Sequence, residues 1–184
     1  RSKLLAEEKL KTIDNLNYNI LRPTAVYGPR DTDIFIFFKQ VAIGLEPYIG
    51  RIEQKLSFIY VIDLAKAVFK ALYAGDKKTF IIGDDIYYDR YQLGLNIKNE
   101  LAKKTIKFHL PVNFVKMIAR VSEKVSYLTN KAAVLNIEKL NELKAVNWSC
   151  SNELAKVKLG FTPSYNLKTG VAETIKWYKQ HNWL

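Results

Sequence analysis

The hydrophobic positions of residues 1–84 fall into short apolar runs separated by stretches with helical spacing. The short runs, at 18–26, 58–61 and 79–82, predict buried strands. The stretches at 33–44 and 64–72 repeat their apolar residues every three or four positions and predict helices. Strands joined by helices of this length form right-handed crossovers. The pattern therefore predicts an α/β fold with a mostly parallel sheet.

The rest of the chain is mostly helical in its spacing. An opening helix is also predicted, and residues 47–57 are predicted to form a short hairpin or an irregular return. The predicted helices outside the first set span 2–16, 91–103, 112–128, 137–143, 153–159 and 169–180, and one further strand is predicted at 105–110. Gly160, with Pro163 beyond it, predicts the end of the helix at 153–159.

The segment 19–31 is a candidate site. It predicts a strand that ends in Gly28-Pro29, after which Asp31 and its neighbours offer oxygens to cap a helix. In open α/β sheets, ligands bind beyond the carboxyl ends of the strands. The local pattern is equally compatible with a binding site and with an ordinary strand-loop-helix connection.

Composition excludes several classes of protein. With 184 residues and 48% hydrophobic residues, the chain predicts a globular fold. One cysteine, Cys150, permits no internal disulfide, and with only His109 and His181 beside it no metal-ligand cluster is expected. The charged N-terminus lacks the apolar run of a signal peptide, so a cytoplasmic protein is expected.

The net charge of +11 raises the question of nucleic acid. The lysines are spread along the chain, and Lys77-Lys78 and Lys103-Lys104 are the only adjacent pairs. A solvated basic surface is therefore favoured over a nucleic-acid interface, and no nucleic-acid partner is expected.

The predicted helix at 112–128 carries an apolar stripe. Its members recur at helical spacing and are Phe114, Met117, Ile118, Val121, Val125 and Leu128. Such a stripe fits a membrane surface, a partner protein or the interior of the fold. Packing within the core or the substrate lobe is favoured, and no membrane partner is expected.

Four motifs in register resemble the extended short-chain dehydrogenase/reductases, also described as the NAD-dependent epimerase/dehydratase family. The motifs are Ser2-Lys3-x-x-Ala6-Glu7, Leu21-Arg22-Pro23-x-x-Val26-Tyr27-Gly28-Pro29-x-Asp31, Phe58-x-Tyr60-Val61-x-Asp63-Leu64-Ala65-x-Ala67, and Leu159-Gly160-Phe161-Thr162-Pro163 followed by Gly170-Val171-x-x-Thr174-Ile175-x-Trp177-Tyr178. The resemblance implies the C-terminal part of a Rossmann-type parallel sheet plus a mostly helical substrate-binding lobe. Residues 1–84 would belong to the first, with 45–57 inserted in the lobe, and 85–184 to the second.

The resemblance also implies the site. Lys3 would be the catalytic lysine, with the family's catalytic tyrosine four residues upstream of it and the glycine-rich loop earlier still. NAD or NADP would contact Lys3, Pro23, Thr24, Ala25 and Val26, and the substrate would contact Tyr27, Arg30 and Arg51. Asp63, which precedes a helix, is interpreted as a structural N-cap.

The implied function is an NAD(P)-dependent epimerase, dehydratase or hydroxy-dehydrogenase. This chain would be its substrate-binding half, inactive and without bound cofactor by itself. Leu56 occupies the position where sugar-nucleotide enzymes often carry an arginine, which favours the branch with 3β-hydroxysteroid-dehydrogenase-like and dihydroflavonol-reductase-like proteins. The substrate would be a sugar nucleotide or a steroid-like or flavonoid-like hydroxy compound. A homodimer through the first helix is possible, and the alternative function is a noncatalytic binding module.

Overall fold

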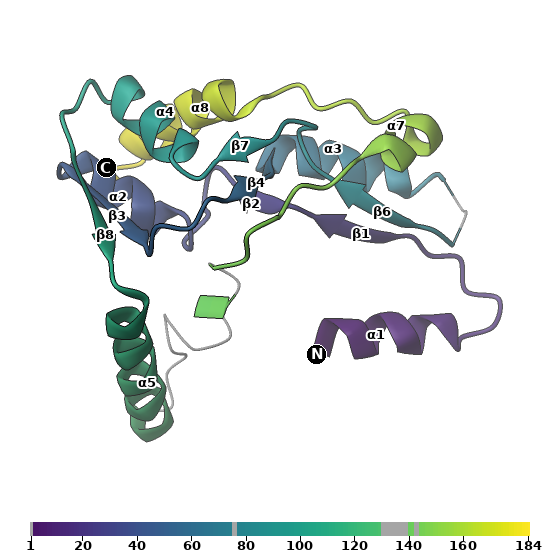
Figure 1. Ribbon diagram of the computed structural model, residues 1–184. Coiled ribbons are helices and arrows are strands. Elements are labelled where there is room, and N and C mark those ends of the chain that lie inside the picture. The colour runs from purple at the N-terminus through teal and green to yellow at the C-terminus, as the bar shows by residue number, and fades with distance from the viewer. Residues whose placement is uncertain (1, 75–76, 130–139, 142–143) are drawn as a thin grey trace.

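The computed structural model describes residues 2–74, 77–129, 140–141 and 144–184 (Figure 1). Within these residues strands and helices mix along the chain, and three of the four pairs of strands are parallel. The predicted α/β class and the mostly parallel pairing are therefore confirmed. The helix predicted at 137–143 falls largely outside the described residues.

The strand predicted at 18–26 forms two consecutive strands. These are β1 (Ile20–Pro23) and β2 (Ala25–Tyr27), each with its own parallel partner. β1 pairs with β6 (Thr79–Ile82), and β2 pairs with β5 (Phe58–Tyr60). Both partners are strands that the apolar runs predicted.

Thr24 is the point at which this segment changes partner. Its backbone N–H donates to the carbonyl of Ile82 at 2.9 Å, whereas the next N–H, that of Ala25, donates to the carbonyl of Ser57 at 3.2 Å. The N–H of Asp84 in turn donates to the carbonyl of Phe58 at 2.9 Å. These bonds join the two strand pairs, so the segment is held along its whole length.

The helices that follow these strands form close to their predicted positions. α2 (Phe35–Ala42) lies within the predicted 33–44, and α3 (Val61–Ala71) contains most of the predicted 64–72. The Asp31 carboxylate accepts hydrogen bonds from the N–H groups of Asp33 at 3.2 Å and Ile34 at 2.9 Å, as a capping side chain does. The opening helix α1 (Ser2–Lys11) is shorter than the predicted 2–16.

Of the two alternatives predicted for 47–57, the hairpin is wrong. β3 (Leu45–Ile49) pairs in parallel with the distant β8 (Ile106–Leu110), and β4 (Lys55–Leu56) pairs in antiparallel fashion with β7 (Tyr88–Asp89). The buried side of β3 includes Glu46, which is 1% exposed. A carboxylate on the buried face breaks the apolar alternation by which a strand is predicted.

Four helices of the C-terminal section were predicted within a few residues of their bounds. They are α4 (Gln92–Glu100), α5 (Val112–Thr129), α7 (Glu153–Leu159) and α8 (Leu167–Gln180). Gly160 follows α7 in the left-handed conformation, with φ of 56°. Its predicted role as a C-terminal cap is therefore confirmed.

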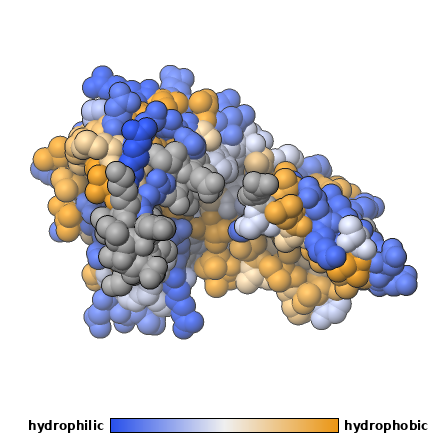
Figure 2. All heavy atoms as spheres, turned by 90° about the horizontal axis from the view of Figure 1, so that it is seen from below, coloured by the Kyte–Doolittle hydropathy of each residue, from blue (hydrophilic) through white to orange (hydrophobic). Residues whose placement is uncertain are grey.

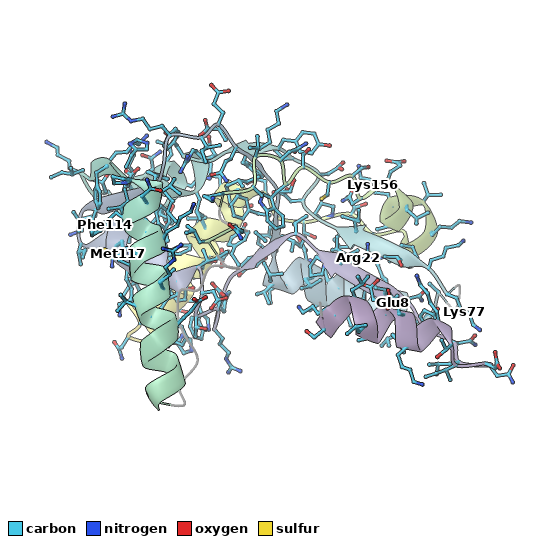
Figure 3. All side chains as sticks on the ribbon, turned by 60° about the horizontal axis from the view of Figure 1, so that its bottom comes forward. Glu8, Arg22, Lys77, Phe114, Met117 and Lys156 are labelled. Carbon is cyan, nitrogen blue, oxygen red and sulfur yellow. The ribbon has the colours of Figure 1, made fainter. Side chains whose placement is uncertain are left out.

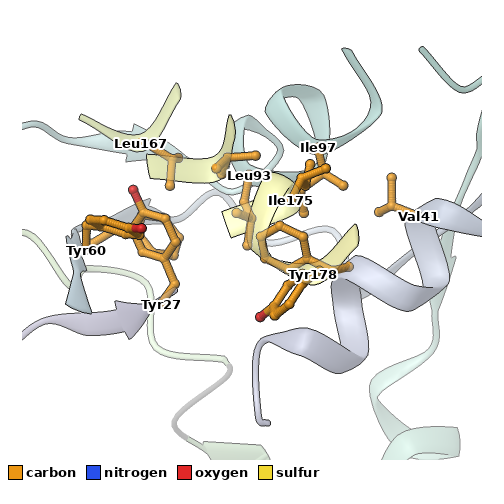
Figure 4. Packing of buried hydrophobic residues seen from close by; sticks show 11 residues of the cluster. Tyr27, Val41, Tyr60, Leu93, Ile97, Leu167, Ile175 and Tyr178 are labelled. Carbon is orange, nitrogen blue, oxygen red and sulfur yellow. The ribbon is translucent and has the colours of Figure 1, made fainter. Parts of the chain in front are cut away.

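α8 is the centre of the larger hydrophobic core. Its buried side chains pack against those of β2, β5, α2 and α4 (Figure 4). The buried members are Tyr27, Phe38, Val41, Phe58, Tyr60, Leu93, Ile97, Leu167, Val171, Ile175 and Tyr178. A second buried cluster joins α3, β6 and α7. The two clusters fix both ends of the segment from β1 to β2.

The apolar stripe of α5 is not packed into the core, contrary to the prediction. Phe114, Met117, Ile118 and Val121 are 46%, 54%, 41% and 57% exposed, and the side chains of the two later stripe residues lie outside the described part. Hydrophobic residues also gather in the middle of the face seen in Figure 2. Of the helices within the described residues, none is both long enough and apolar enough to cross a bilayer.

Candidate functional site

An ion pair with fork geometry joins α1 to β1. Nε of Arg22 donates to Oε1 of Glu7 at 3.0 Å, and Nη2 donates to Oε2 at 2.5 Å. Arg22 lowers the pKa of the Glu7 carboxyl, mainly through this hydrogen bond, and Glu7 raises the pKa of Arg22 in return. Arg22 is therefore an ion-pairing residue in the structure.

This ion pair also determines which way Lys3 faces. Lys3 precedes Glu7 by four residues in α1, so the two side chains share one face of the helix. Because Glu7 reaches Arg22 on β1, Lys3 lies on the face of α1 that is turned toward the sheet, one turn from the ion pair. Its side chain is exposed, so its ammonium is available to another group.

The predicted cofactor segment combines exposed positions with a buried hydroxyl. Pro23 and Ala25 are exposed, and Val26 is half-buried. The hydroxyl of Thr24 is buried without a hydrogen-bond partner. It lies close to Gly83, since a methyl group placed on that glycine would be 3.4 Å from Thr24 Oγ1.

Asn152 adds a second such atom beside Gly83. Its side-chain nitrogen donates to the carbonyl of Gly83 at 3.0 Å, while its Oδ1 is buried without a partner. Buried polar atoms normally have a hydrogen-bond partner. Thr24 Oγ1 and Asn152 Oδ1 both lack one beside Gly83, which makes this end of β6 a candidate binding position.

Tyr27 does not lie where a substrate-binding residue was expected. It is 1% exposed, and its hydroxyl donates to the carbonyl of Asn166 at 3.3 Å. A methyl group on Gly170 would lie 2.0 Å from the Tyr27 oxygen, so α8 approaches the ring directly. Burial, and then the nearby Asp84, raise the pKa of this phenol. Tyr27 is a core residue in the structure.

The two arginines of the predicted site follow different strands. Arg30 is exposed in the loop after β2, where its φ is 68°. Arg51 is exposed after β3 and faces His109 of β8. Desolvation, followed by Arg51 and two further cations, lowers the pKa of His109. Arg51 therefore lies beside the β3–β8 pair, and its contact with a substrate stays a prediction.

Asp63 does not cap the helix as predicted. α3 begins at Val61, and Asp63 lies within its first turn, fully buried. Its Oδ2 accepts hydrogen bonds from the N–H groups of Ser164 at 2.7 Å and Tyr165 at 2.8 Å. Its Oδ1 accepts one from Lys66 at 3.0 Å. The carboxylate thus ties α3 to a segment about a hundred residues later.

The sequence interpretation missed a buried acid at the carboxyl end of β6. Asp84 is 5% exposed, and its Oδ2 accepts a hydrogen bond from the Tyr88 hydroxyl at 2.6 Å. The same hydroxyl accepts one from the N–H of Leu167 at 3.0 Å. Burial raises the pKa of Asp84 to about 6. The turn directly after this apolar run was the feature of the sequence that could have indicated a functional acid at Asp84.

The raised pKa of Asp84 predicts a pH-dependent stability. The folded protein holds this proton more tightly than the unfolded chain does, so the stabilisation is complete below pH 3.8 and is lost as the pH rises through about 6. Relative to Asp84→Asn, the wild-type free energy of unfolding should fall by about 2 kcal/mol between pH 4 and pH 7. Urea titrations across this range measure it. The exposed Asp14→Asn variant is the control, and a pH-independent difference between wild type and Asp84→Asn would contradict the prediction.

The fold and the N-terminal motifs are similar to those of Rossmann-type epimerases and dehydratases. Residues 1–83 match the model of the NAD dependent epimerase/dehydratase family, which confirms the relationship that the sequence motifs predicted. Among curated proteins, the chain is similar to one from Caulobacter vibrioides described as ceramide reductase. The two are 26% identical over 192 residues, which cover 100% of this chain and 57% of that protein.

Solved structures share the fold over nearly the whole chain. The UDP-glucose 4-epimerase of Thermotoga maritima, solved with UDP-glucose, superposes with a TM-score of 0.76 at 21% identity, covering 98% of this chain and 53% of that one. The dTDP-glucose 4,6-dehydratase of Bacillus anthracis, in complex with NAD, gives 0.69 at 17% identity, covering 99% and 50%. The chain therefore spans about half the length of the proteins it matches.

Proposed function

We propose that this chain is the substrate-binding half of an NAD(P)-dependent enzyme that interconverts a hydroxyl and a carbonyl group on an apolar substrate. The observation that supports the proposal is an ion pair between the elements that carry two family motifs. Glu7, four residues after Lys3 on α1, pairs with Arg22, which directly precedes Pro23 on β1. Both lie within the stretch that matches the family.

The residues present fit the nicotinamide end of NAD or NADP. Pro23 and Ala25 are exposed at the end of the parallel pair, and the Thr24 hydroxyl is a buried donor without a partner. In the intact enzyme, Lys3 and residues 23–26 would hold this end of the cofactor. When bound, the cofactor supplies the hydride chemistry of the reaction.

Lys3 would contribute through its charge. An ammonium group beside a phenol favours the phenolate, which lowers the pKa of the phenol toward neutrality and lets it act as a general base. The phenol in question is the tyrosine that the family places four residues before this lysine. The exposed ammonium of Lys3, on the face of α1 turned to the sheet, is available for this role.

Two observations support an apolar substrate over a sugar nucleotide. Leu56 stands where an arginine pairs with the diphosphate in many sugar-nucleotide enzymes, and its side chain packs against the larger core. A position held by core packing offers no cation to a diphosphate. The similarity to the protein described as ceramide reductase points to the same substrate class.

The experiment measures NAD(P)H oxidation by the full-length protein. We expect turnover with a ketone of a ceramide-type lipid in detergent micelles and none with UDP-glucose or dTDP-glucose. Turnover of the sugar nucleotides alone would overturn the substrate class. Absence of turnover, together with a phenylalanine four residues before Lys3, would instead establish a noncatalytic binding module.

Binding of the reduced cofactors to the isolated 184-residue chain is a separate test. It contains no glycine-rich loop for the pyrophosphate, so it should bind NADH and NADPH weakly, without saturation in the micromolar range. Fluorescence titration of the reduced cofactors tests this expectation. Tight, saturable binding by the isolated chain would contradict the division of the site between two halves of an enzyme.

A further inference from the structure

A buried arginine beside the β3–β8 pair has no acidic partner among the described residues. Arg90 is 8% exposed, and its Nη1 and Nη2 donate to the carbonyls of Ile52 at 2.6 Å and Ile49 at 3.0 Å. Its Nε is buried without a hydrogen-bond partner. A buried charge is costly unless an opposite charge lies close to it. The surroundings of Arg90 therefore favour an anion.

Two further basic side chains surround the same pair of aromatic rings. The rings of Tyr48 and Tyr91 meet edge to face, with centroids 4.8 Å apart. The guanidinium carbon of Arg90 lies 5.4 and 5.6 Å from these centroids, and Nζ of Lys107 lies 5.8 and 3.9 Å from them. His109 is the register partner of Tyr48, and its Nε2 shares a hydrogen bond of 2.9 Å with the Tyr91 hydroxyl. Arg90, Lys107 and His109 thus lie around one aromatic pair.

Arg51 adds another cation at the carboxyl end of the same strands. It is exposed in the turn after β3, between the two carbonyls that Arg90 binds. Desolvation lowers the pKa of His109, and the charges of Arg51, Arg90 and Lys107 lower it further. In the part of the chain that the structure describes, neither Arg51 nor Lys107 forms an ion pair with an acid. Positive charge therefore gathers here without compensation.

The acidic residues of this region do not pair with these cations. Glu46 is the register partner of Lys107, but its Oε1 binds Nζ of Lys98 at 3.1 Å. Asp89 is exposed, and its Oδ1 accepts a hydrogen bond from the N–H of Tyr91 at 2.6 Å. Glu53 is exposed as well. Within the described residues, none of the three carboxylates forms an ion pair with Arg51, Arg90 or Lys107.

We propose that Arg51, Lys107 and His109, with the buried charge of Arg90 beside them, bind a phosphate-type oxyanion at the carboxyl end of the β3–β8 pair. We call this position the anion site. Ligands of parallel sheets bind beyond the carboxyl ends of the strands, which lie side by side here (Figure 1). β8 leads directly into α5, along which Phe114 and Met117 lie (Figure 3).

The side chains of the anion site offer donors that suit phosphate oxygens. An arginine presents a planar fork of N–H groups, and a lysine presents a compact point charge. Nδ1 of His109 has no hydrogen-bond partner within the described part of the chain, so it is a further candidate contact. The chemistry is shared by inorganic phosphate and by a phosphate ester. The inference does not depend on the proposed reaction.

The test is isothermal titration calorimetry of the full-length protein with inorganic phosphate and with glycerol 3-phosphate. Saturating NADH and a constant ionic strength keep the cofactor site occupied and the screening unchanged. We expect saturable binding. Tighter binding of glycerol 3-phosphate would identify an ester as the ligand, and tighter binding of phosphate would identify the inorganic anion. Both orders support the site, whereas the absence of saturable binding of either probe would overturn it.

Two double variants with the same net charge separate the anion site from the general basic surface. Arg51→Gln with Lys107→Gln should weaken binding at least about tenfold, because charge-assisted hydrogen bonds are lost. Lys158→Gln with Lys168→Gln, at exposed positions of α7 and α8, should change the affinity by less than about twofold. Circular dichroism confirms that each variant is folded. Unchanged binding by the first variant, or an equal loss in the second, would contradict the proposal.

His109 gives a second readout that does not rely on a variant of the site. A bound anion offsets the neighbouring cations, so phosphate should raise the pKa of His109. The groups facing its ring are Tyr48, Tyr91 and the three cations named above. NMR titration of the ring protons measures the change, with the signal assigned from His109→Gln. The signal of His181 is the control and should not respond. An equal response of His109 to sodium chloride at the same ionic strength would overturn the site, because screening alone would then explain it.

Discussion

Replacing Lys3 with methionine is expected to lower kcat of the intact enzyme by about 100-fold or more, because a positioned acid-base system contributes roughly 10²–10⁴ to rate. Methionine keeps the length and the apolar stem of lysine but removes the charge that would favour a neighbouring phenolate. The loss should be smaller at high pH, where the phenol ionises without help. Initial rates across pH 6–10 with saturating cofactor measure both effects.

The matched control for Lys3 lies on the same helix. Lys9→Met removes an equally exposed ammonium from the last turn of α1, away from the predicted site, and should leave kcat within about twofold. Equal losses in the two variants would show that α1 as a whole, and not the Lys3 ammonium, had been affected. An unchanged pH profile in Lys3→Met would also contradict the proposed role.

Replacing Asp63 with alanine is expected to destabilise the fold by about 3–4 kcal/mol. The substitution leaves the N–H groups of Ser164 and Tyr165 without their acceptor and removes one of the two partners of Lys66, the other being the Ser164 hydroxyl. These groups connect α3 to the chain that leads into α8. Urea unfolding followed by tryptophan fluorescence measures the change.

Asp63→Asn separates the hydrogen bonds from the charge. Its amide oxygen can still accept from both N–H groups, so a loss of about 1–2 kcal/mol is expected, roughly half that of the alanine variant. Asp14→Ala, at an exposed position, should change stability by no more than about 0.5 kcal/mol. If Asp63→Asn and Asp63→Ala were equally unstable, the bonds to Ser164 and Tyr165 would not be the source of the effect.

The elements that the sequence predicted correctly are those whose pattern is local. The strand at 58–60 is a short apolar run that is buried as expected, and α8 shows strong helical spacing. The strand at 79–82 also forms as predicted, but it buries Phe80 and Ile82 and leaves Ile81 36% exposed. The pattern fails at β3, because its partner β8 is remote in sequence and its buried face contains Glu46. That carboxylate is satisfied by Lys98 and by neighbouring hydroxyl groups, which no local rule anticipates.

The residues of the candidate site also differ in how far the sequence predicts their roles. The cofactor-binding role of the motif around Pro23 comes from the family resemblance, and it stays a prediction. Tyr27 belongs to the same motif, yet whether its ring faces a pocket or the core depends on the approach of Gly170 from α8. Asp63 and Asp84 likewise acquire their roles from residues brought together by the tertiary fold. Such contacts are invisible to spacing and composition.

The ion pair between Arg22 and Glu7 bears on how firmly α1 is held. None of the residues of α1 is buried, and Leu4 and Leu5 are each 55% exposed. A solvent-exposed ion pair is weakened by salt and contributes little to stability. In the isolated chain, α1 should therefore exchange its amide hydrogens before the strands do. A neighbour that covers Leu4 and Leu5 would immobilise the helix, and the alignment of Lys3 with the sheet would then no longer depend on ionic strength.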